Sequence, residues 1–194
     1  MTKKLNALFL IILLLLCLEE TSLAVNSLTA INPENLKQLR EKYYAAVEEE
    51  DNLVEYESFL KSFATEKNNP IIIAYYAGIE AIKSKHAFWP MTKVKHLNNS
   101  LELLEKAIML DQKNLEIRFM RFSMLHYVPD FLGYGNLKKE DSAVIVKELF
   151  KRDFSLIDEE TQTGIAEFMI NSKRITEAQT IMLKKTFPVF IAHE

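Results

Sequence analysis

Two arginines, Arg118 and Arg121, are the residues of this chain best suited to hold a charged group. They lie three residues apart in a segment of helical period, so their side chains are neighbours on the helix surface. One interpretation makes the pair a fork for a peptide carboxylate, a sulfate or a phosphate. The other is structural, because a buried guanidinium needs internal partners, and Glu80, Glu116 or a loop carbonyl could serve. The structural interpretation is the one we prefer.

One loop is rich in glycine and contains the large apolar residues Phe131, Leu132 and Tyr134. These residues could form a mobile lid or an aromatic contact for a peptide. Alternatively, they fold down as a plug over the end of the helices, with Gly133 and Gly135 adopting positive φ angles. The plug is the interpretation we prefer.

The connection Phe88-Trp89-Pro90 contains the only tryptophan of the chain and lies between two apolar segments. A buried wedge explains an indole in this place more simply than a recognition residue does. We therefore expect Trp89 to pack against the helix over 71–83 and against Phe131.

Other chemistry finds no support in the residue spacing. No two of the four histidines lie three or four apart on one helix, and the single cysteine lies in the N-terminal apolar run, so we expect no metal site. No serine lies in a Gly-x-Ser-x-Gly elbow. The acidic pairs 140–141 and 159–160 fall at predicted helix starts, where the helix dipole accounts for them. We expect no catalytic residue, cofactor or metal.

Composition limits the classes of partner and of fold. The 194 residues carry a net charge of −3 and no basic tract, which argues against binding to nucleic acid or anionic lipid. Only four glycines and five prolines occur, and this scarcity favours helices over a loop-rich scaffold. The remaining partner class is a protein or a peptide. The composition does not determine the oligomeric state.

The N-terminus has the parts of a secretory signal. Lys3 and Lys4 precede an apolar run over 5–16. Ser22-Leu23-Ala24 has the small residues, two positions apart, that are typical of a signal-peptide cleavage site. The run is too short to span a bilayer, so we expect no stable membrane insertion after cleavage. We predict a signal peptide over 1–24 and a mature protein in the periplasm or outside the cell.

Two alternatives to a cleaved signal remain. Lipid attachment at Cys17 is disfavoured because Leu16 occupies a position that normally holds a small residue, and an uncleaved anchor is the other possibility. After cleavage at Ala24 the protein has no cysteine, so no disulfide can stabilise it. A flexible segment over 25–31 and a helical domain over 32–190 complete the predicted organisation.

Helical period continues through the rest of the chain, and no useful strand pattern occurs. The segment 71–83 is apolar nearly all round, so we expect it to be a central helix. Expected helix starts include Pro33 after Asn32, and Asp51 and Asn114 as N-caps. A further helix is predicted after the break at 85–90, with its apolar residues over 97–110, and others are predicted at 142–152, 159–172 and 176–187.

The segment 104–114 resembles the second helix and exit turn of a tetratricopeptide repeat. The matching residues are Leu104, Ala107, Leu110 and Asp111, and Ser100 and Gly78 resemble the small residues that let paired helices approach. The resemblance implies an all-α fold of antiparallel helical hairpins stacked as a short α-solenoid, whose concave surface binds proteins.

These observations lead to one preferred function and two alternatives. We expect an exported, non-enzymatic binding or assembly module, with a peptide or protein partner on a concave helical surface. The expected contact residues are Tyr75, Arg118, Arg121, Phe131 and Tyr134. The first alternative is an enzyme or small-ligand binder in which the arginine pair grips an anion between the helices 114–127 and 142–152. The second is an auxiliary subunit, suggested by the apolar tail 189–191.

Overall fold

The computed structural model describes residues 31–66 and 68–187. The predicted signal peptide, nearly all of the segment 25–31 and the apolar tail 189–191 lie outside these residues. The chain divides into two compact units, one ending at Gln38 and the other beginning at Leu39. The described part of the first unit, residues 31–38, holds the start of the first described helix, where the Asn32 side chain accepts a hydrogen bond from the Glu34 backbone N–H at 2.9 Å.

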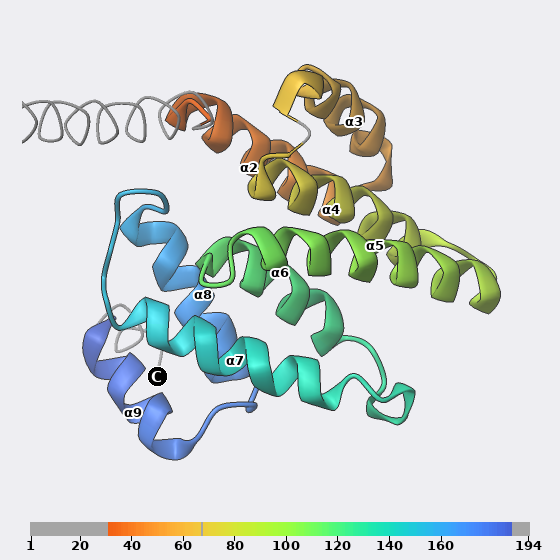
Figure 1. The fold of residues 1–194 in the computed structure, drawn as a ribbon. Coiled ribbons are helices and arrows are strands. Elements are labelled where there is room, and N and C mark those ends of the chain that lie inside the picture. Colours follow the sequence, from red (N-terminus) through yellow and green to blue (C-terminus); the bar gives the residue numbers. More distant parts are fainter. Residues whose placement is uncertain (1–30, 67, 188–194) are drawn as a thin grey trace, which may run out of the picture. The chain divides into compact units, whose positions relative to one another are not determined.

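The described residues are all-helical, as predicted, and contain no strand. Figure 1 shows the helices in chain order. Their bounds are α2 (Pro33–Glu48), α3 (Leu53–Lys61), α4 (Pro70–His86), α5 (Pro90–Leu110), α6 (Leu115–His126), α7 (Gly135–Leu149), α8 (Glu159–Asn171) and α9 (Glu177–Thr186). Short 3₁₀ turns occur at Glu50–Asn52, Ala64–Glu66 and Asp130–Leu132.

Local capping explains where several helices begin. The Asn114 side chain accepts from the Ile117 N–H at the start of α6, as predicted. The prediction for Asp51 is wrong, because this residue lies in a 3₁₀ turn and α3 starts without a side-chain cap. The helix expected from residue 142 begins at Gly135 instead. Its buried face includes Lys138 and Asp141, so an apolar pattern could not reveal its first turns.

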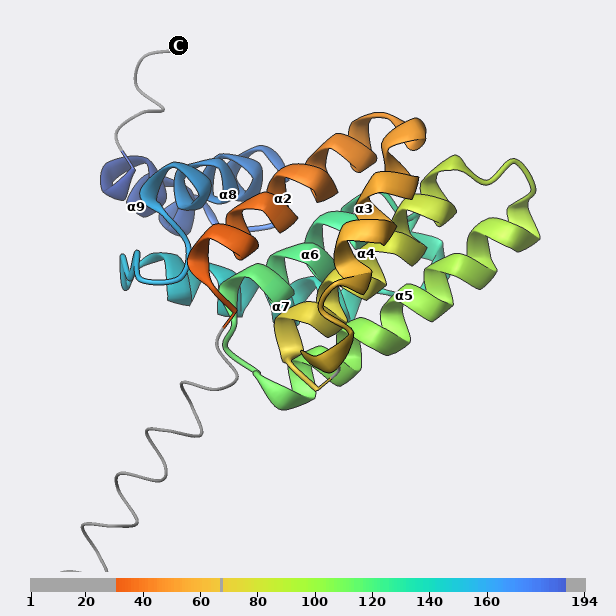
Figure 2. The same cartoon turned by 90° about the horizontal axis from the view of Figure 1, so that it is seen from above.

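Helix α4 is central, as its apolar composition predicts. It packs against α3, α5 and α6 and buries nine of its residues. Figure 2 shows α4 and α5 running side by side as a hairpin. Gly78 is required where α4 meets two aromatic side chains: an added Cβ would lie 2.8 Å from Tyr43 Cε2 and 3.2 Å from the Tyr56 hydroxyl. Gly78 therefore permits a close approach of aromatic rings to the α4 backbone.

A second apolar cluster joins the C-terminal helices. Helix α6 packs on α7, α7 on α8 and α8 on α9. The buried members of the cluster include Phe122 of α6, Leu149 of α7, Met169 of α8 and Leu183 of α9. Consecutive helices thus bury their apolar faces against one another, and this arrangement holds α6 and α8 close together.

The prediction of a buried Trp89 is wrong. The Trp89 side chain is 68 % exposed, and its predicted neighbour Phe131 is 86 % exposed. The connection between α4 and α5 is short, and Pro90 is already the first residue of α5. The turn therefore lies at the end of the hairpin, where the indole contacts the ring of Phe88 rather than the core.

Candidate functional site

The two arginines of α6 are buried in an ion-pair network with α7. Asp141 is fully buried and accepts from both: from Arg121 Nε and Nη2 at 2.7 Å each, and from Arg118 Nη1 at 2.9 Å. Arg118 also donates to Glu140 and, through Nε, to the Gln112 carbonyl at 2.9 Å. Two guanidinium groups therefore face two carboxylates, one fully buried and one half exposed, and the charges balance within this network.

This network supports the structural interpretation of the arginine pair. We predicted that a loop carbonyl could accept from the arginines, and the Gln112 carbonyl does so. The prediction that Glu80 or Glu116 pairs with them is wrong, because the paired carboxylates are Glu140 and Asp141. The pair 140–141 lies within α7 rather than at a helix start. Burial alone would lower the pKa of Arg118, but hydrogen bonds to Glu140 and Asp141 raise it. The guanidinium group stays charged, and its bonds are directed inward rather than toward an external anion.

Tyr75 belongs to a second buried network and offers no surface to a partner. It is 1 % exposed and donates to Glu116 Oε1 at 2.5 Å. Arg40 donates to both Glu116 oxygens at 2.8 Å and to the Leu156 carbonyl at 2.9 Å. Burial, together with the negative charge of Glu116, raises the pKa of Tyr75 well above its usual value, so the phenol remains a hydrogen-bond donor.

The loop between α6 and α7 does not form the predicted plug. Phe131 and Leu132 are exposed, whereas Tyr134 is half-buried and donates to Asn98 Oδ1 of α5 at 3.3 Å. Gly133 has the predicted positive φ, at 86°, while Gly135 does not and is simply the first residue of α7.

Ion pairs at Asp130 attach the start of this loop to other elements. Asp130 accepts from Lys138 and from Arg174 of the segment between α8 and α9. These bonds attach the 3₁₀ turn at its first residue. The first residue of the turn is thus tied to α7 and to the segment before α9, while Phe131 remains exposed.

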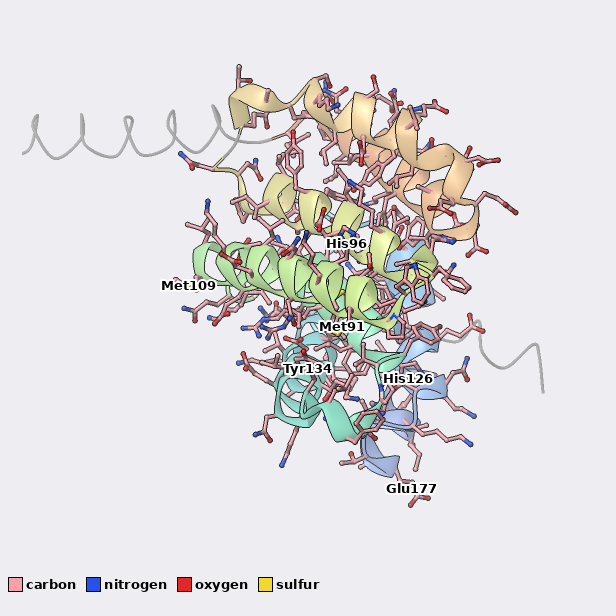
Figure 3. The ribbon with its side chains drawn as sticks, turned by 90° about the vertical axis from the view of Figure 1, so that its right-hand side faces the viewer. Met91, His96, Met109, His126, Tyr134 and Glu177 are labelled. Carbon is pink, nitrogen blue, oxygen red and sulfur yellow. The ribbon has the colours of Figure 1, made fainter. Side chains whose placement is uncertain are left out.

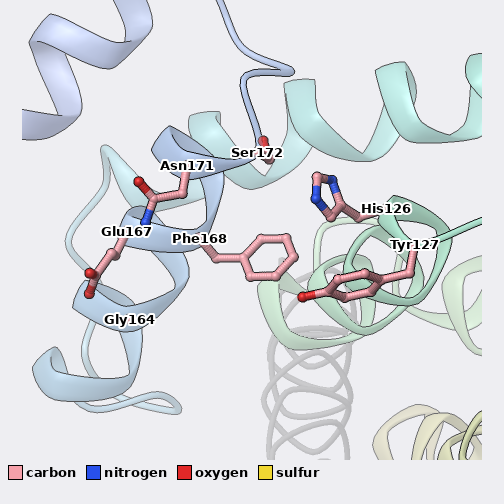
Figure 4. Close-up of a pocket in the computed structure, with 7 residues that line it drawn as sticks. All are labelled: His126, Tyr127, Gly164, Glu167, Phe168, Asn171 and Ser172. Carbon is pink, nitrogen blue, oxygen red and sulfur yellow. The ribbon is translucent and has the colours of Figure 1, made fainter.

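A pocket of about 390 Å³ lies between the end of α6 and helix α8 (Figure 4). It is open to solvent, and no sequence pattern predicted it. The residues that line it are His126, Tyr127, Gly164, Glu167, Phe168, Asn171 and Ser172. A lone glycine within a predicted helix, Gly164, was the available signal, since such a glycine often has a packing or functional reason.

Aromatic rings form one wall of the pocket. The centroid of the Phe168 ring lies 5.3 Å from the centroid of the His126 ring and 6.4 Å from that of the Tyr127 ring. Both pairs are arranged edge to face. Figure 4 shows the three rings together, with the Glu167 and Asn171 side chains on another side of α8. The pocket thus combines an apolar wall with a carboxylate and an amide, a combination typical of sites that bind side chains or small ligands.

His126 is held neutral at this site. Burial, followed by the positive charges of Arg174 and Lys138, lowers the pKa of the imidazole below its usual value. Its Nδ1 atom is buried and has no hydrogen-bond partner among the described residues. A neutral ring with an unused polar atom can accept or donate one hydrogen bond to a bound group.

Metal binding finds no geometric support in the part of the chain that the structure describes. No group of three or more His, Cys, Asp or Glu side chains there could hold an ion. His96 instead hydrogen-bonds Glu80 at 2.8 Å. Within residues 31–66 and 68–187, no helix has the length and apolar character needed to cross a membrane.

Comparison with known protein families, curated proteins and solved structures finds no match for this chain.

Proposed function

We propose that this protein is an exported, non-enzymatic binding module that holds a peptide or protein partner at the pocket between α6 and α8. The observation that carries the proposal is an aromatic pocket beside a strongly exposed ring, since Tyr127 lines the pocket and is 78 % exposed. Exposed aromatic residues next to a pocket are typical of interaction sites. Export is supported by the signal-like segment 1–24.

The partner in this proposal inserts one side chain into the pocket and lies along the neighbouring loop. Phe168 and Tyr127 provide apolar contact, while Glu167 and Asn171 provide hydrogen bonds to the backbone or side chain of the ligand. Phe131, one of the expected contact residues, is exposed in the loop that follows α6 and extends this surface.

A stacked, tetratricopeptide-like arrangement is part of the same proposal. The pairs α4–α5 and α6–α7 consist of consecutive helices in direct contact, as helical hairpins require. The enzyme alternative loses its main support, because Arg118 and Arg121 are buried and paired with Glu140 and Asp141.

Photocrosslinking in the cells that make the protein tests this proposal. A benzophenone amino acid at position 127 should capture a discrete protein or peptide. The same group at Met109, which is exposed at the far end of α5, should not. Equal labelling at both positions, or no adduct at position 127, would contradict a binding site at the pocket.

Substitution of Gly164 provides a matched test of the pocket itself. A Cβ at Gly164 meets nothing within 4 Å, and Gly164 lines the pocket, so the side chain of Gly164→Leu should occupy pocket volume. Leucine is also a better helix former by about 1 kcal/mol, so stability should not fall. The variant should lose the adduct at position 127, whereas Gly135→Ala, which also has free space, should keep it. Retention of the adduct in Gly164→Leu would contradict the proposal.

A further inference from the structure

The carboxylate of Asp130 accepts from two cations that belong to different elements. Lys138 of α7 is buried and donates to Asp130 Oδ1 and, at 3.4 Å, to the Val128 carbonyl. Arg174, between α8 and α9, donates through Nη2 to both Asp130 oxygens, at 3.2 and 3.4 Å. We call residues 127–134 the α6–α7 connection. Lys138 ties this connection to the helix that follows it, whereas Arg174 ties it to the chain that leaves α8.

The ion pair between Asp130 and Arg174 joins the two sides of the pocket. Tyr127 lines the pocket directly after α6, and Ser172 lines it directly after α8. Asp130 follows Tyr127 by three positions, and Arg174 follows Ser172 by two. A bond between Asp130 and Arg174 therefore limits how far the chain after α6 can move from the chain after α8.

The same ion pair lies close to His126, a further lining residue of the pocket. Burial lowers the pKa of the imidazole most, and the positive charge of Arg174 is the next cause, while Asp130 raises it. Figure 3 shows the face of the molecule on which the α6–α7 connection lies, with His126 before the connection and Tyr134 at its end. Charge interactions of this size require groups near one another, so the ion pair borders the pocket wall.

Arg174 extends from a firmly held main chain. Its backbone N–H donates to Ser172 Oγ at 3.2 Å, and this hydroxyl donates to the Met169 carbonyl at 2.7 Å. Ile175 packs against the apolar cluster of the C-terminal helices, and Thr176 forms the capping box of α9. The segment before α9 is thus fixed on both sides of Arg174, and its guanidinium group can hold a less firmly packed partner in place.

The α6–α7 connection is such a partner, because little of its apolar surface is buried. The side chains of Tyr127, Phe131 and Leu132 are all exposed. Segments with few buried apolar contacts open at a small cost in free energy. The bonds at Asp130, with the bond from Tyr134 to Asn98, therefore account for much of its attachment.

We propose that Arg174 is a positioning residue of the pocket, whose ion pair with Asp130 holds the α6–α7 connection near α8 and keeps Tyr127 beside Phe168. This inference rests on the proposed function, in which Tyr127 contacts the partner. The side chain of Arg174 is 31 % exposed and that of Asp130 68 %, so water and salt reach the pair and it opens readily. Lys138 keeps Asp130 attached to α7 when the pair is open, so opening widens the pocket without unfolding the helices.

Hydrogen–deuterium exchange of the full chain, measured by mass spectrometry, tests this inference. In Arg174→Gln the segment 128–134 should exchange about two- to fivefold faster, since an exposed ion pair shifts a local opening by about that factor. Arg174→Lys keeps the charge and should stay within about twofold of the wild type. An unchanged rate in Arg174→Gln would overturn the inference.

Salt provides a readout that a packing role would not change. Raising sodium chloride from about 0.1 M to about 1 M shortens the screening length from about 10 Å to about 3 Å. The wild type should then approach the exchange rate of Arg174→Gln, and that variant itself should change by less than about twofold. A wild-type rate that is equally fast at both salt concentrations would contradict a role for the ion pair.

Arg152→Gln is the matched control. It removes another exposed arginine ion pair, with Glu159 at 2.8 Å, and changes the net charge by the same amount. We expect it to leave the exchange of 128–134 unchanged. An equal effect of Arg152→Gln and Arg174→Gln would overturn the inference, and so would faster exchange over α4 in Arg174→Gln, because both results indicate a global loss of stability.

Photocrosslinking at position 127 measures the consequence for binding. In Arg174→Gln the yield of the adduct should fall by up to about fivefold, because a smaller fraction of the protein holds the pocket in its binding arrangement. Arg174→Lys should retain most of the yield, and Arg152→Gln should retain all of it. An unchanged yield in Arg174→Gln would overturn the positioning role.

The two measurements separate the failure of this inference from the failure of the proposed function. No adduct in the wild type would contradict the proposed function and with it the role of Arg174 in binding, whatever the exchange rates are. An adduct in the wild type, with exchange and yield both unchanged in Arg174→Gln, would overturn this inference alone and leave the proposed function standing.

Discussion

Asp141 neutralises the buried positive charge of α6. It accepts three hydrogen bonds from two guanidinium groups and has no exposed surface. Glu140 shares the same arginines, but its side chain is half exposed, so water can replace much of its effect. The two adjacent acids therefore differ greatly in what their removal should cost.

Replacing Asp141 should expose this difference. Asp141→Asn keeps the side-chain size but leaves two buried guanidinium groups with too little negative charge. We expect a loss of about 3–5 kcal/mol in the free energy of unfolding, measured by urea denaturation. Glu140→Gln is the control, with an expected loss below about 1 kcal/mol. Equal losses in the two variants would mean that Asp141 is not the main counter-ion.

At the scale of elements, close packing of helices depends on residues that no helical period identifies. Gly78 lies within α4, and its missing side chain leaves room for rings from α2 and α3. The resemblance to a tetratricopeptide repeat implied that Gly78 lets the paired helix of its hairpin approach. The structure adds that the approaching groups are the rings of Tyr43 and Tyr56.

Gly78→Ala should destabilise the protein although alanine is the better helix former. A Cβ 2.8 Å from Tyr43 Cε2 forces the ring to move, at a cost of about 1–3 kcal/mol. Helix propensity returns about 1 kcal/mol at most. We expect a net loss of about 1 kcal/mol by thermal or urea unfolding. Gly164→Ala, where a Cβ has free space, should be neutral or stabilising, and the opposite order would refute the close approach.

The whole molecule should lose stability in mildly acidic solution because of His126. Its pKa is lowered in the folded protein by burial and then by Arg174 and Lys138, while an unfolded histidine titrates near 6.5. Between these two values the unfolded chain binds more protons, so its population rises as pH falls. The contribution of His126 is complete above about pH 6.5 and is lost as pH decreases through the folded pKa.

Urea unfolding between pH 8 and pH 5 measures this effect. The stability of the wild type should decrease below about pH 6.5, and His126→Gln should decrease less over the same range. The carboxyl groups of Asp130 and Glu140 have lowered pKa values, so they gain protons only at more acidic pH. They therefore do not cause the expected difference between the wild type and His126→Gln. Parallel curves for the two proteins would show that His126 does not titrate as described.

The all-helical class, the central position of α4 and several helix starts followed from the sequence. Asn114 illustrates the reason: a cap and a 3.6-residue period involve residues within a few positions of each other. The start of α7 was missed because buried charges interrupt its apolar pattern. Of the expected contact residues, Phe131 is exposed and Tyr134 half-buried, whereas Tyr75, Arg118 and Arg121 are buried.

The sequence by itself determined that the described chain is helical and that its charged α6 needs internal partners. Only the tertiary structure decided which partners those are, since Arg121 and Asp141 lie 20 positions apart and Arg40 and Glu116 lie 76 apart. It also decided that Trp89 is exposed and that a pocket opens between α6 and α8. Exposure and pairing depend on how distant segments pack together, and a local pattern carries no information about that packing.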